Sequence, residues 1–291
     1  MNQYPLLRNA SLAFPFVLIW TSAFPAAKIG LIDSPPLLFL TLRFLVAGAL
    51  MLAWAHWRGT LRKLTLQELG VLSALGLLNH ALYLGLSWTG MGSLSSGLST
   101  ILISANPIVV AVLSSFLLRE PLTRQKVLGL ALGFLGVAFI VRNRIGSTTD
   151  TLEGFLLVLA ALLTLAFGTV LYKKWPVRTD IVTGTGFQII LSGLLLLPVA
   201  LFMEDWSAIA WTPSFAGAFV WLVLVVSITG YQLWFNLLER GSASAASVWF
   251  FLTPPLGLLA GAWLLDEPLN WIDFIGIVPV VLGIVLVTRA R

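Results

Sequence analysis

Two stretches that read alike decide the fold: REPLTRQKVLGLALGFLGVAFIVR at residues 119–142 and DEPLNWIDFIGIVPVVLGIVLVTR at residues 266–289. At a constant offset of 147 positions, each contains Glu-Pro-Leu followed by glycines at matching places. Further upstream, Pro107 and Pro254 share the same offset. Self-similarity at a fixed spacing indicates an internal repeat. We therefore predict two homologous halves, residues 1–145 and 146–291.

Composition places both halves in a membrane. Of the 291 residues 58% are hydrophobic and only 10% are charged, and the mean hydropathy is +0.97. A soluble domain carries about 25% charged residues, and this chain has too few to cover a soluble surface. A soluble enzyme, a disordered chain and a fibrous chain are therefore excluded. With no cysteine, the chain has no disulfide framework, thiolate metal site or cysteine nucleophile.

The apolar residues form ten runs, each near the roughly 20 residues that a spanning helix needs. The predicted spans are 11–31, 36–55, 69–88, 93–118, 127–142, 153–172, 181–202, 214–238, 241–265 and 271–288. Runs such as Leu191 to Phe202 are continuous, which favours helices over the alternating strands of a barrel. The sequence thus predicts an all-α membrane protein, whose N-terminal run is a first spanning helix and not a cleaved signal peptide.

Basic residues predict the orientation. An even number of spans puts both termini on one side, and thirteen of the 17 Lys and Arg residues lie on that side. The other side has Lys28, Arg142 and Arg144. The positive-inside rule then predicts that both termini are cytoplasmic. The pI of 9.9 reflects this orientation, so we expect the lipid bilayer and no nucleic acid as a partner.

Five spans in each half is an odd number, so the halves are expected to lie upside down relative to each other. The charges agree, because Arg119 and Lys126 flank the first Glu-Pro-Leu whereas Asp266 and Asp273 flank the second. Inverted repeats are typical of secondary transporters, whose solute site lies near the midplane between the repeats.

These features resemble the EamA-domain family of the drug/metabolite transporter superfamily. The resemblance rests on ten spans in two halves, the two Glu-Pro-Leu signatures at 120–122 and 267–269, the glycine-rich fifth and tenth spans, and the early Trp20-Thr21-Ser22-Ala23-Phe24. Within that family the chain is most like YddG-type exporters of aromatic and other amino acids. The resemblance implies a multi-pass protein of the bacterial inner (plasma) membrane, with a cavity lined mostly by spans 1–4 and 6–9.

The resemblance also implies transport without ATP, and the sequence contains no G-x-x-x-x-G-K-[ST] loop. We expect no cofactor, no metal site and no catalytic residue. The expected partner is a small-molecule substrate, such as an amino acid or a similar metabolite, and the expected state is a monomer.

Arg43 is the clearest intramembrane charge, about seven residues or roughly 10 Å from the outer end of its span. Such a charge is costly unless it is functional or paired. Arg43 is predicted to face the cavity and hold a carboxylate; the alternatives are that it snorkels outward or pairs with Asp33. Its repeat partner, at an offset of 145, is the neutral Gln188.

Two other spans carry polar groups at helical spacing. Asn79, His80 and Tyr83 are predicted to share one face of span 3. His80 titrates near neutral pH and could couple protons; the alternative is a neutral histidine bonded to a neighbouring carbonyl. The second group, on span 8, comprises Thr229, Gln232 and Asn236 on one face, with Tyr231 beside it. Hydrogen bonds between helices are an equal explanation for this second group.

Trp20 and Trp249 differ from the tryptophans of the interfacial belt. Both lie near mid-span, five residues before Pro25 and Pro254 respectively, where we expect helix breaks that face protein or a wet cavity. They are predicted to wall the cavity, the alternative being lipid-facing packing. Together with Asn79 and Tyr83 they are predicted to face one space between the halves, with Arg43 toward its outer mouth.

The sequence therefore predicts a secondary exporter of small polar metabolites, amino acids above all, working by alternating access. The few basic side chains in the spans argue against strongly polyanionic solutes. An intramembrane enzyme would need paired acids or a Ser/His/Asp set within the spans, and the interiors of the predicted spans contain no Asp or Glu. A channel is a third possibility, although a pore is more naturally built by oligomeric symmetry.

Overall fold

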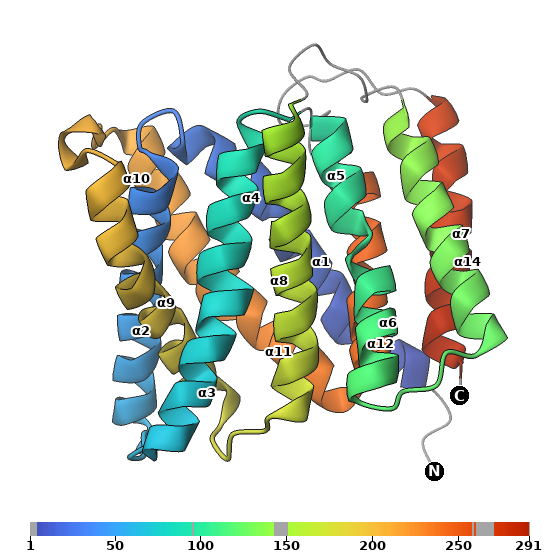
Figure 1. Ribbon diagram of the computed structural model, residues 1–291, viewed down its shortest axis with the longest axis horizontal. Helices are drawn as coiled ribbons and strands as arrows, with labels where there is room; N and C mark the ends of the chain where they lie inside the picture. The colour runs from blue at the N-terminus through green and yellow to red at the C-terminus, as the bar shows by residue number, and fades with distance from the viewer. Residues whose placement is uncertain (1–4, 95, 143–150, 258, 260–270, 291) are drawn as a thin grey trace.

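A computed structural model describes residues 5–94, 96–142, 151–257, 259 and 271–290, and all regular elements in these residues are helical (Figure 1). In the first half they are α1 (Pro5–Gly30), α2 (Pro36–Trp57), α3 (Leu66–Gly76), the π-helical η1 (Leu77–Leu82), α4 (Tyr83–Met91), α5 (Ser96–Ser104), α6 (Asn106–Leu117) and α7 (Arg124–Val141). In the second half they are α8 (Leu152–Lys174), α9 (Ile181–Met203), the short η3 (Trp206–Ala208), α10 (Pro213–Val220), the π-helical η4 (Trp221–Gly230), α11 (Tyr231–Arg240), α12 (Ala243–Ser247), the 3₁₀-helical η5 (Val248–Leu252) and η6 (Trp271–Gly276), and α14 (Ile277–Arg289).

Within the described residues, eight helical segments are long and apolar enough to cross a membrane. A shorter apolar helix, Phe274–Arg289, follows them. The all-helical, multi-pass membrane fold is thus confirmed. Most of the latter half of the predicted span 241–265, and the second Glu-Pro-Leu at 267–269, lie outside the described residues. The start of α1 and the end of α14 lie at one face of the bundle, here called the terminal face; the other is the opposite face (Figure 1).

Polar caps fix where six of the described α-helices begin. A side-chain oxygen placed just before the first helical residue accepts a backbone N–H that the helix leaves unpaired. Thr65 forms a complete capping box with Glu68 before α3. A side-chain cap of the simpler kind is formed by Thr123 before α7, Thr151 before α8, Asp180 before α9, Thr212 before α10 and Ser242 before α12. These caps lie in the short polar breaks that separate the apolar runs, which is why the predicted spans end close to the observed helices.

Prolines interrupt the helices at fewer places than expected. The predicted break at Pro25 is wrong, because α1 continues to Gly30 with Pro15 and Pro25 inside it. The lost hydrogen bond of a proline is tolerated in a membrane helix when neighbouring groups compensate. In span 4, by contrast, α5 ends at Ser104 and α6 begins at Asn106, one residue before Pro107. Before Pro254 the chain changes from the 3₁₀ turn η5 to α-helix.

The helices pack in a reciprocal pattern. Helix α2 packs on α9, α7 packs on α14, and α6 packs on α12. The contact of α4 with α8 has its counterpart in the contact of α1 with α10, η4 and α11. Between α7 and α14, a Cβ on Gly129 would fall 2.8 Å from the carbonyl oxygen of Gly283, and one on Gly136 would fall 2.7 Å from that of Gly276. Since Gly129 corresponds to Gly276 and Gly136 to Gly283 in the repeat, these two contacts exchange under a twofold operation. An inverted repeat requires this reciprocity at its axis.

Candidate functional site

A cavity of about 570 Å³ reaches from the opposite face into the middle of the bundle. Its mouth lies among the ends of α1 and α4, where Lys28, Ile32 and Gly92 are exposed. Its walls come from α1, α2, α4, α5, the junction of η4 with α11, and the chain around Pro254. The volume lies within the roughly 300–1,000 Å³ of typical small-molecule sites, so the cavity can enclose a small metabolite.

Aromatic rings line the deep end of this cavity. The Trp20 indole lies parallel to the Tyr83 ring at a centroid distance of 6.4 Å. It meets Tyr231 edge-on at 5.4 Å and Phe250 at 5.5 Å. Trp20 is ten residues before the end of α1, about 15 Å at the helical rise, which puts these rings near mid-depth. Four rings from α1, α4, α11 and η5 therefore form a flat-walled apolar chamber.

Arg43 adds a positive charge to this chamber. Its side chain is 1% exposed and lines the cavity, and its Nε donates a hydrogen bond to Ser227 Oγ at 2.8 Å. Asp33 does not pair with it, because the Asp33 carboxylate accepts from the hydroxyl of Thr212 at 2.5 Å. Within the described residues, Arg43 makes no ion pair. Neither snorkelling to the surface nor the predicted alternative pairing with Asp33 occurs, and the guanidinium is left facing the cavity.

Hydroxyl groups without partners complete the lining. The oxygens of Thr21, Ser99, Tyr231 and Thr253 are buried, lie on the cavity and have no hydrogen-bond partner among the residues that the structure describes. A buried polar group without a partner costs about 1–3 kcal/mol, so such groups favour a ligand that can bond to them. Sequence reasoning missed Thr21, Ser99 and Thr253, since small hydroxyl residues are too frequent in membrane helices to be singled out.

Asn79 and His80 lie behind the cavity wall. The Asn79 amide packs against Gly168 of α8, and the His80 ring meets the Tyr231 ring edge-on at 4.4 Å. The expected shared face with Tyr83 is therefore incorrect for both residues. Both residues lie within η1, whose π-helical turn holds more residues than an α-turn and so changes their angular position relative to Tyr83. Neither nitrogen of His80 has a hydrogen-bond partner in the described part of the chain, so the alternative of a histidine bonded to a carbonyl is not observed there.

The remaining predicted site residues also lie off this cavity. Trp249 is 7% exposed and is not among the lining residues, so the expectation that it shares the cavity with Trp20 is not met. Gln188 lies on a second, smaller cavity of about 210 Å³ between α3, α8 and α9. Gln232 and Asn236 are half-buried on α11, where Asn236 donates to the Gln232 carbonyl at 2.8 Å within the helix. Of the ten predicted site residues, the structure brings together Trp20, Arg43, Tyr83 and Tyr231.

Packed aromatic rings close the cavity toward the terminal face. Phe16, one turn before Trp20 on α1, stacks on Trp234 of α11 at 5.2 Å. Phe250 packs on Trp234 at 5.0 Å and on Phe16 at 5.5 Å. Phe16 is fully buried and Trp234 is 2% exposed. These rings form a continuous apolar floor that separates the cavity from the terminal face.

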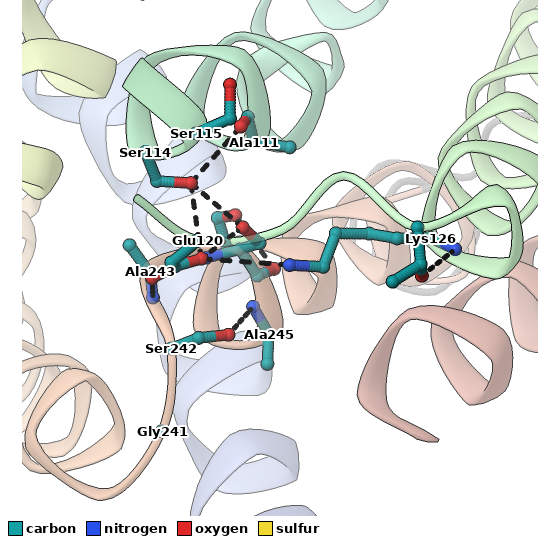
Figure 2. Close-up of polar contacts among 12 residues, drawn as sticks. Ala111, Ser114, Ser115, Glu120, Lys126, Gly241, Ser242, Ala243 and Ala245 are labelled. Carbon is teal, nitrogen blue, oxygen red and sulfur yellow. Dashed lines mark hydrogen bonds and ion pairs between the residues drawn. The ribbon is translucent and has the colours of Figure 1, made fainter. Parts of the chain in front are cut away.

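A polar cluster ties two helices together below that floor (Figure 2). Glu120, the acid of the first Glu-Pro-Leu, accepts the backbone N–H of Ala243 at 2.8 Å and the Ser244 hydroxyl at 2.6 Å. The Ser114 hydroxyl, near the end of α6, donates to the same carboxylate at 3.2 Å, and Lys126 Nζ lies 3.8 Å away. The negative carboxylate thus satisfies free N–H groups at the start of α12 and holds α12 against α6.

Comparison with known proteins agrees with this architecture. A family model described as the EamA-like transporter family matches residues 8–142 and 152–289. A solved structure titled "Crystal structure of protein" superimposes with a TM-score of 0.80, covering 97% of this chain and 96% of that chain at 19% identity, which supports the fold alone.

Curated relatives match along nearly their whole length. "Uncharacterized transporter YvbV" of Bacillus subtilis (strain 168) is 34% identical over 99% of this chain and 93% of its own. "Protein PecM" of Dickeya dadantii (strain 3937) is 26% identical over 94% of this chain and 90% of its own. The "Probable amino-acid metabolite efflux pump" of Escherichia coli (strain K12) is 26% identical over 95% of this chain and 93% of its own. The chain therefore belongs to the EamA-like transporter family, and it is a transporter and not an enzyme.

Proposed function

We propose that this protein exports small metabolites, foremost amino acids including aromatic ones, by alternating access without ATP. The observation that carries the proposal is a cavity of about 570 Å³ that is open at one face and sealed at the other. A carrier needs this arrangement, because its solute site must communicate with one side of the membrane at a time. Further support comes from the name of the Escherichia coli relative, an amino-acid metabolite efflux pump.

The proposal includes an architecture of ten spans, as two inverted repeats at 1–145 and 146–291, with both termini in the cytoplasm of a bacterium and a monomer in its inner membrane. The terminal face is then cytoplasmic, so the cavity described above is open to the outside. The reciprocal packing of α7 with α14 supports the inverted repeat. Such a repeat makes the two open states close in energy, because each half can adopt the conformation of the other.

In this proposal Trp20, Arg43, Tyr83 and Tyr231 contact the solute in the outward-open state. Contacts from Asn79, His80, Gln188, Gln232, Asn236 and Trp249 stay predictions for other states of the cycle. Gln188 already lines a cavity with the loop after α8. His80 stays a candidate for proton coupling, and its ring lies beside that of Tyr231 with the two centroids 4.4 Å apart.

Purified protein in liposomes tests the proposal. Vesicles loaded with one solute from a panel of amino acids, organic acids and organic cations are diluted into labelled solute, with and without a pH gradient. A carrier shows saturable counterflow, with the largest signal expected for an amino acid or its close derivatives. The broader candidate, an exporter of other drugs or metabolites, predicts counterflow with other members of the panel. A current that rises linearly with voltage and does not saturate would contradict a carrier.

A further inference from the structure

We propose that the cavity selects aromatic carboxylates of net charge −1, with the carboxylate on Arg43, over zwitterionic amino acids of the same size. This inference rests on the proposed export of small metabolites, and within that range it places monoanionic aromatic acids ahead of the amino acids themselves. It concerns which charge the substrate carries when bound, a property that neither the family nor the names of the relatives specify.

The first argument is the charge of the lining. Among the described residues that line the cavity, Lys28 and Arg43 are cations and none is an Asp or Glu. Arg43 lies at the deep end and its one hydrogen bond goes to a neutral hydroxyl, Ser227 Oγ. A buried cation without a counter-ion is unfavourable. A carboxylate that enters the cavity supplies the missing negative charge and bonds to the planar guanidinium fork.

The second argument is that no described residue of the cavity wall carries a negative charge to pair with an ammonium group. An amino acid brings a positive charge one bond away from the carboxyl carbon, so both charges would reach the same end of the cavity. Among the described residues of the cavity wall, the unpartnered side-chain groups that could accept from an ammonium are neutral hydroxyls, such as those of Tyr231 and Thr21. Repulsion from Arg43 would oppose the ammonium, whereas a neutral amide or a plain methylene at the same place meets no such repulsion.

The third argument is the shape of the rest of the cavity wall, apart from Arg43. Trp20, Tyr83 and Phe250 present ring faces and edges to the same cavity that Arg43 lines. Flat apolar walls favour a planar or aromatic body through burial of its surface and offset or edge-on ring contacts. The unpartnered hydroxyls of Thr21 and Tyr231 can donate to the second carboxylate oxygen. A monoanion with one aromatic ring fits each of these features.

Three probes that share the phenylalanine skeleton vary the charge, and 3-phenylpropanoate, which carries −1 and is no larger than phenylalanine, controls for the bulk of an acetyl group. N-acetylphenylalanine carries −1, phenylalanine is a zwitterion, and phenylalanine amide carries +1 when the assay is run at about pH 6, below the pKa of its amine. Each is measured for inhibition of counterflow in liposomes and for thermal stabilisation of the detergent-purified protein, which follows ligand affinity. We expect the N-acetylated acid to bind at least about tenfold more tightly than phenylalanine, and the amide most weakly, since a hydrogen bond to a charged group is worth a tenfold factor or more.

Variants of Arg43 and of its partner Ser227 test whether the preference for the acid comes from the charge of Arg43. Arg43→Gln should reduce affinity for the N-acetylated acid by about tenfold or more while changing affinity for the amide little or raising it. Arg43→Lys should restore part of the preference for the acid. The matched control is Ser227→Ala, which removes the one hydrogen bond of Arg43 but keeps the charge and should retain the preference.

The outcomes separate this inference from the proposed function. Saturable counterflow in which phenylalanine equals or exceeds its N-acetyl derivative would overturn the charge preference and leave the exporter proposal standing. An equal loss for all three probes in Arg43→Gln, accompanied by a lower melting temperature, would show that Arg43 is structural and would also overturn it. If no solute of the wider panel undergoes counterflow, the proposed function itself fails.

Discussion

Trp20 and Trp249 lie on different helices at comparable depth, and both are more than nine-tenths buried. The indole of Trp20 lines the cavity and touches four other rings. Trp249 does not line it, and its indole N–H has no partner. The side that each ring faces is set by the helix that carries it, since Trp20 lies on a regular α-helix whereas Trp249 lies in the 3₁₀ turn η5. The two residues therefore make a matched pair for a test.

Trp20→Ala should weaken solute binding while the protein still inserts and purifies. Loss of one aromatic ring from a solute contact is worth about 1–3 kcal/mol, or roughly tenfold or more in affinity. Trp249→Ala should lower the melting temperature through a core void and change solute affinity less than Trp20→Ala does, because Trp249 does not line the outward-open cavity. Half-saturation of counterflow, measured for both variants, checks this. Equal affinity losses in the two variants would place the site elsewhere.

Depth and polarity in the sequence were sufficient to find Trp20, Arg43, Tyr83 and Tyr231, because a large ring or charge in a membrane span stands out against an apolar background. They were insufficient for Asn79 and His80. Their predicted face assumed α-helical spacing, and the π-turn η1 changes that spacing. No sequence signal for such a turn was available. Likewise Ser227, the partner of Arg43, could not be identified, since it is 184 residues away and belongs to the other half.

At the level of helices, acids in the connecting loops cap the helices of distant segments. Glu120 caps α12 at the terminal face, and at the opposite face Glu204 accepts the N–H groups of Leu37 and Leu38 at 3.0 and 2.7 Å, at the start of α2. A carboxylate at a helix N-terminus is stabilised by the unpaired N–H groups and by the helix dipole. The Glu-Pro-Leu motif, recognised in the sequence as a repeat marker, thus has a physical role in the first half: its acid joins α6 to α12 across the two halves.

Glu120→Gln should loosen the closure at the terminal face. The neutral amide keeps the size of the side chain but gives up charge-assisted hydrogen bonds, each worth about 1.5–3 kcal/mol. A cysteine introduced at Ala13, which is fully buried and one turn closer than Phe16 to the terminal face, reports the opening. In the Glu120→Gln background a membrane-permeant maleimide should label this cysteine about tenfold faster, as a shift of 1.4 kcal/mol would produce.

The control for this experiment is Glu68→Gln on the same face. Glu68 also caps a helix, α3, and pairs with Arg62 at 2.5 Å. These contacts involve neither α6 nor α12, so the labelling rate of the cysteine at position 13 should stay unchanged. Similar acceleration by both substitutions would mean a general loss of stability and would rule out a specific closure through Glu120.

For the whole molecule, the sequence predicted the all-helical membrane fold because two global properties determine it. Runs of apolar residues define helices that bury their own backbone hydrogen bonds. The sequence match between the two halves, at an offset of 147 positions, implies that each half packs like the other. The cavity and the side on which it opens were beyond such reasoning. They depend on which of the two nearly equivalent faces of the bundle is closed. In this structure the terminal face is closed by contacts such as those of Glu120 with Ser244 and of Phe16 with Trp234.

Orientation and opening make one joint prediction. Ala208 in the loop after α9 and Thr60 after α2 are both exposed, and their helix ends lie on opposite faces of the bundle (Figure 1). Because the chain has no cysteine, maleimide labelling of a variant with one introduced cysteine reports on that position alone. In intact cells, Ala208→Cys should react with an impermeant maleimide added outside, and Thr60→Cys should react only after the cells are opened.

The cavity should follow the same side as residue 208, since its mouth is formed by the ends of α1 and α4 on the opposite face. Ser99→Cys, on the cavity wall and 1% exposed at present, should therefore be labelled by a small impermeant reagent from outside, more slowly than Ala208→Cys. A transported solute should protect position 99 but not position 208, because the solute occupies the cavity alone. If Thr60→Cys is the one that reacts in intact cells, the terminal face is external, the cavity opens to the cytoplasm, and the proposed direction of transport is reversed.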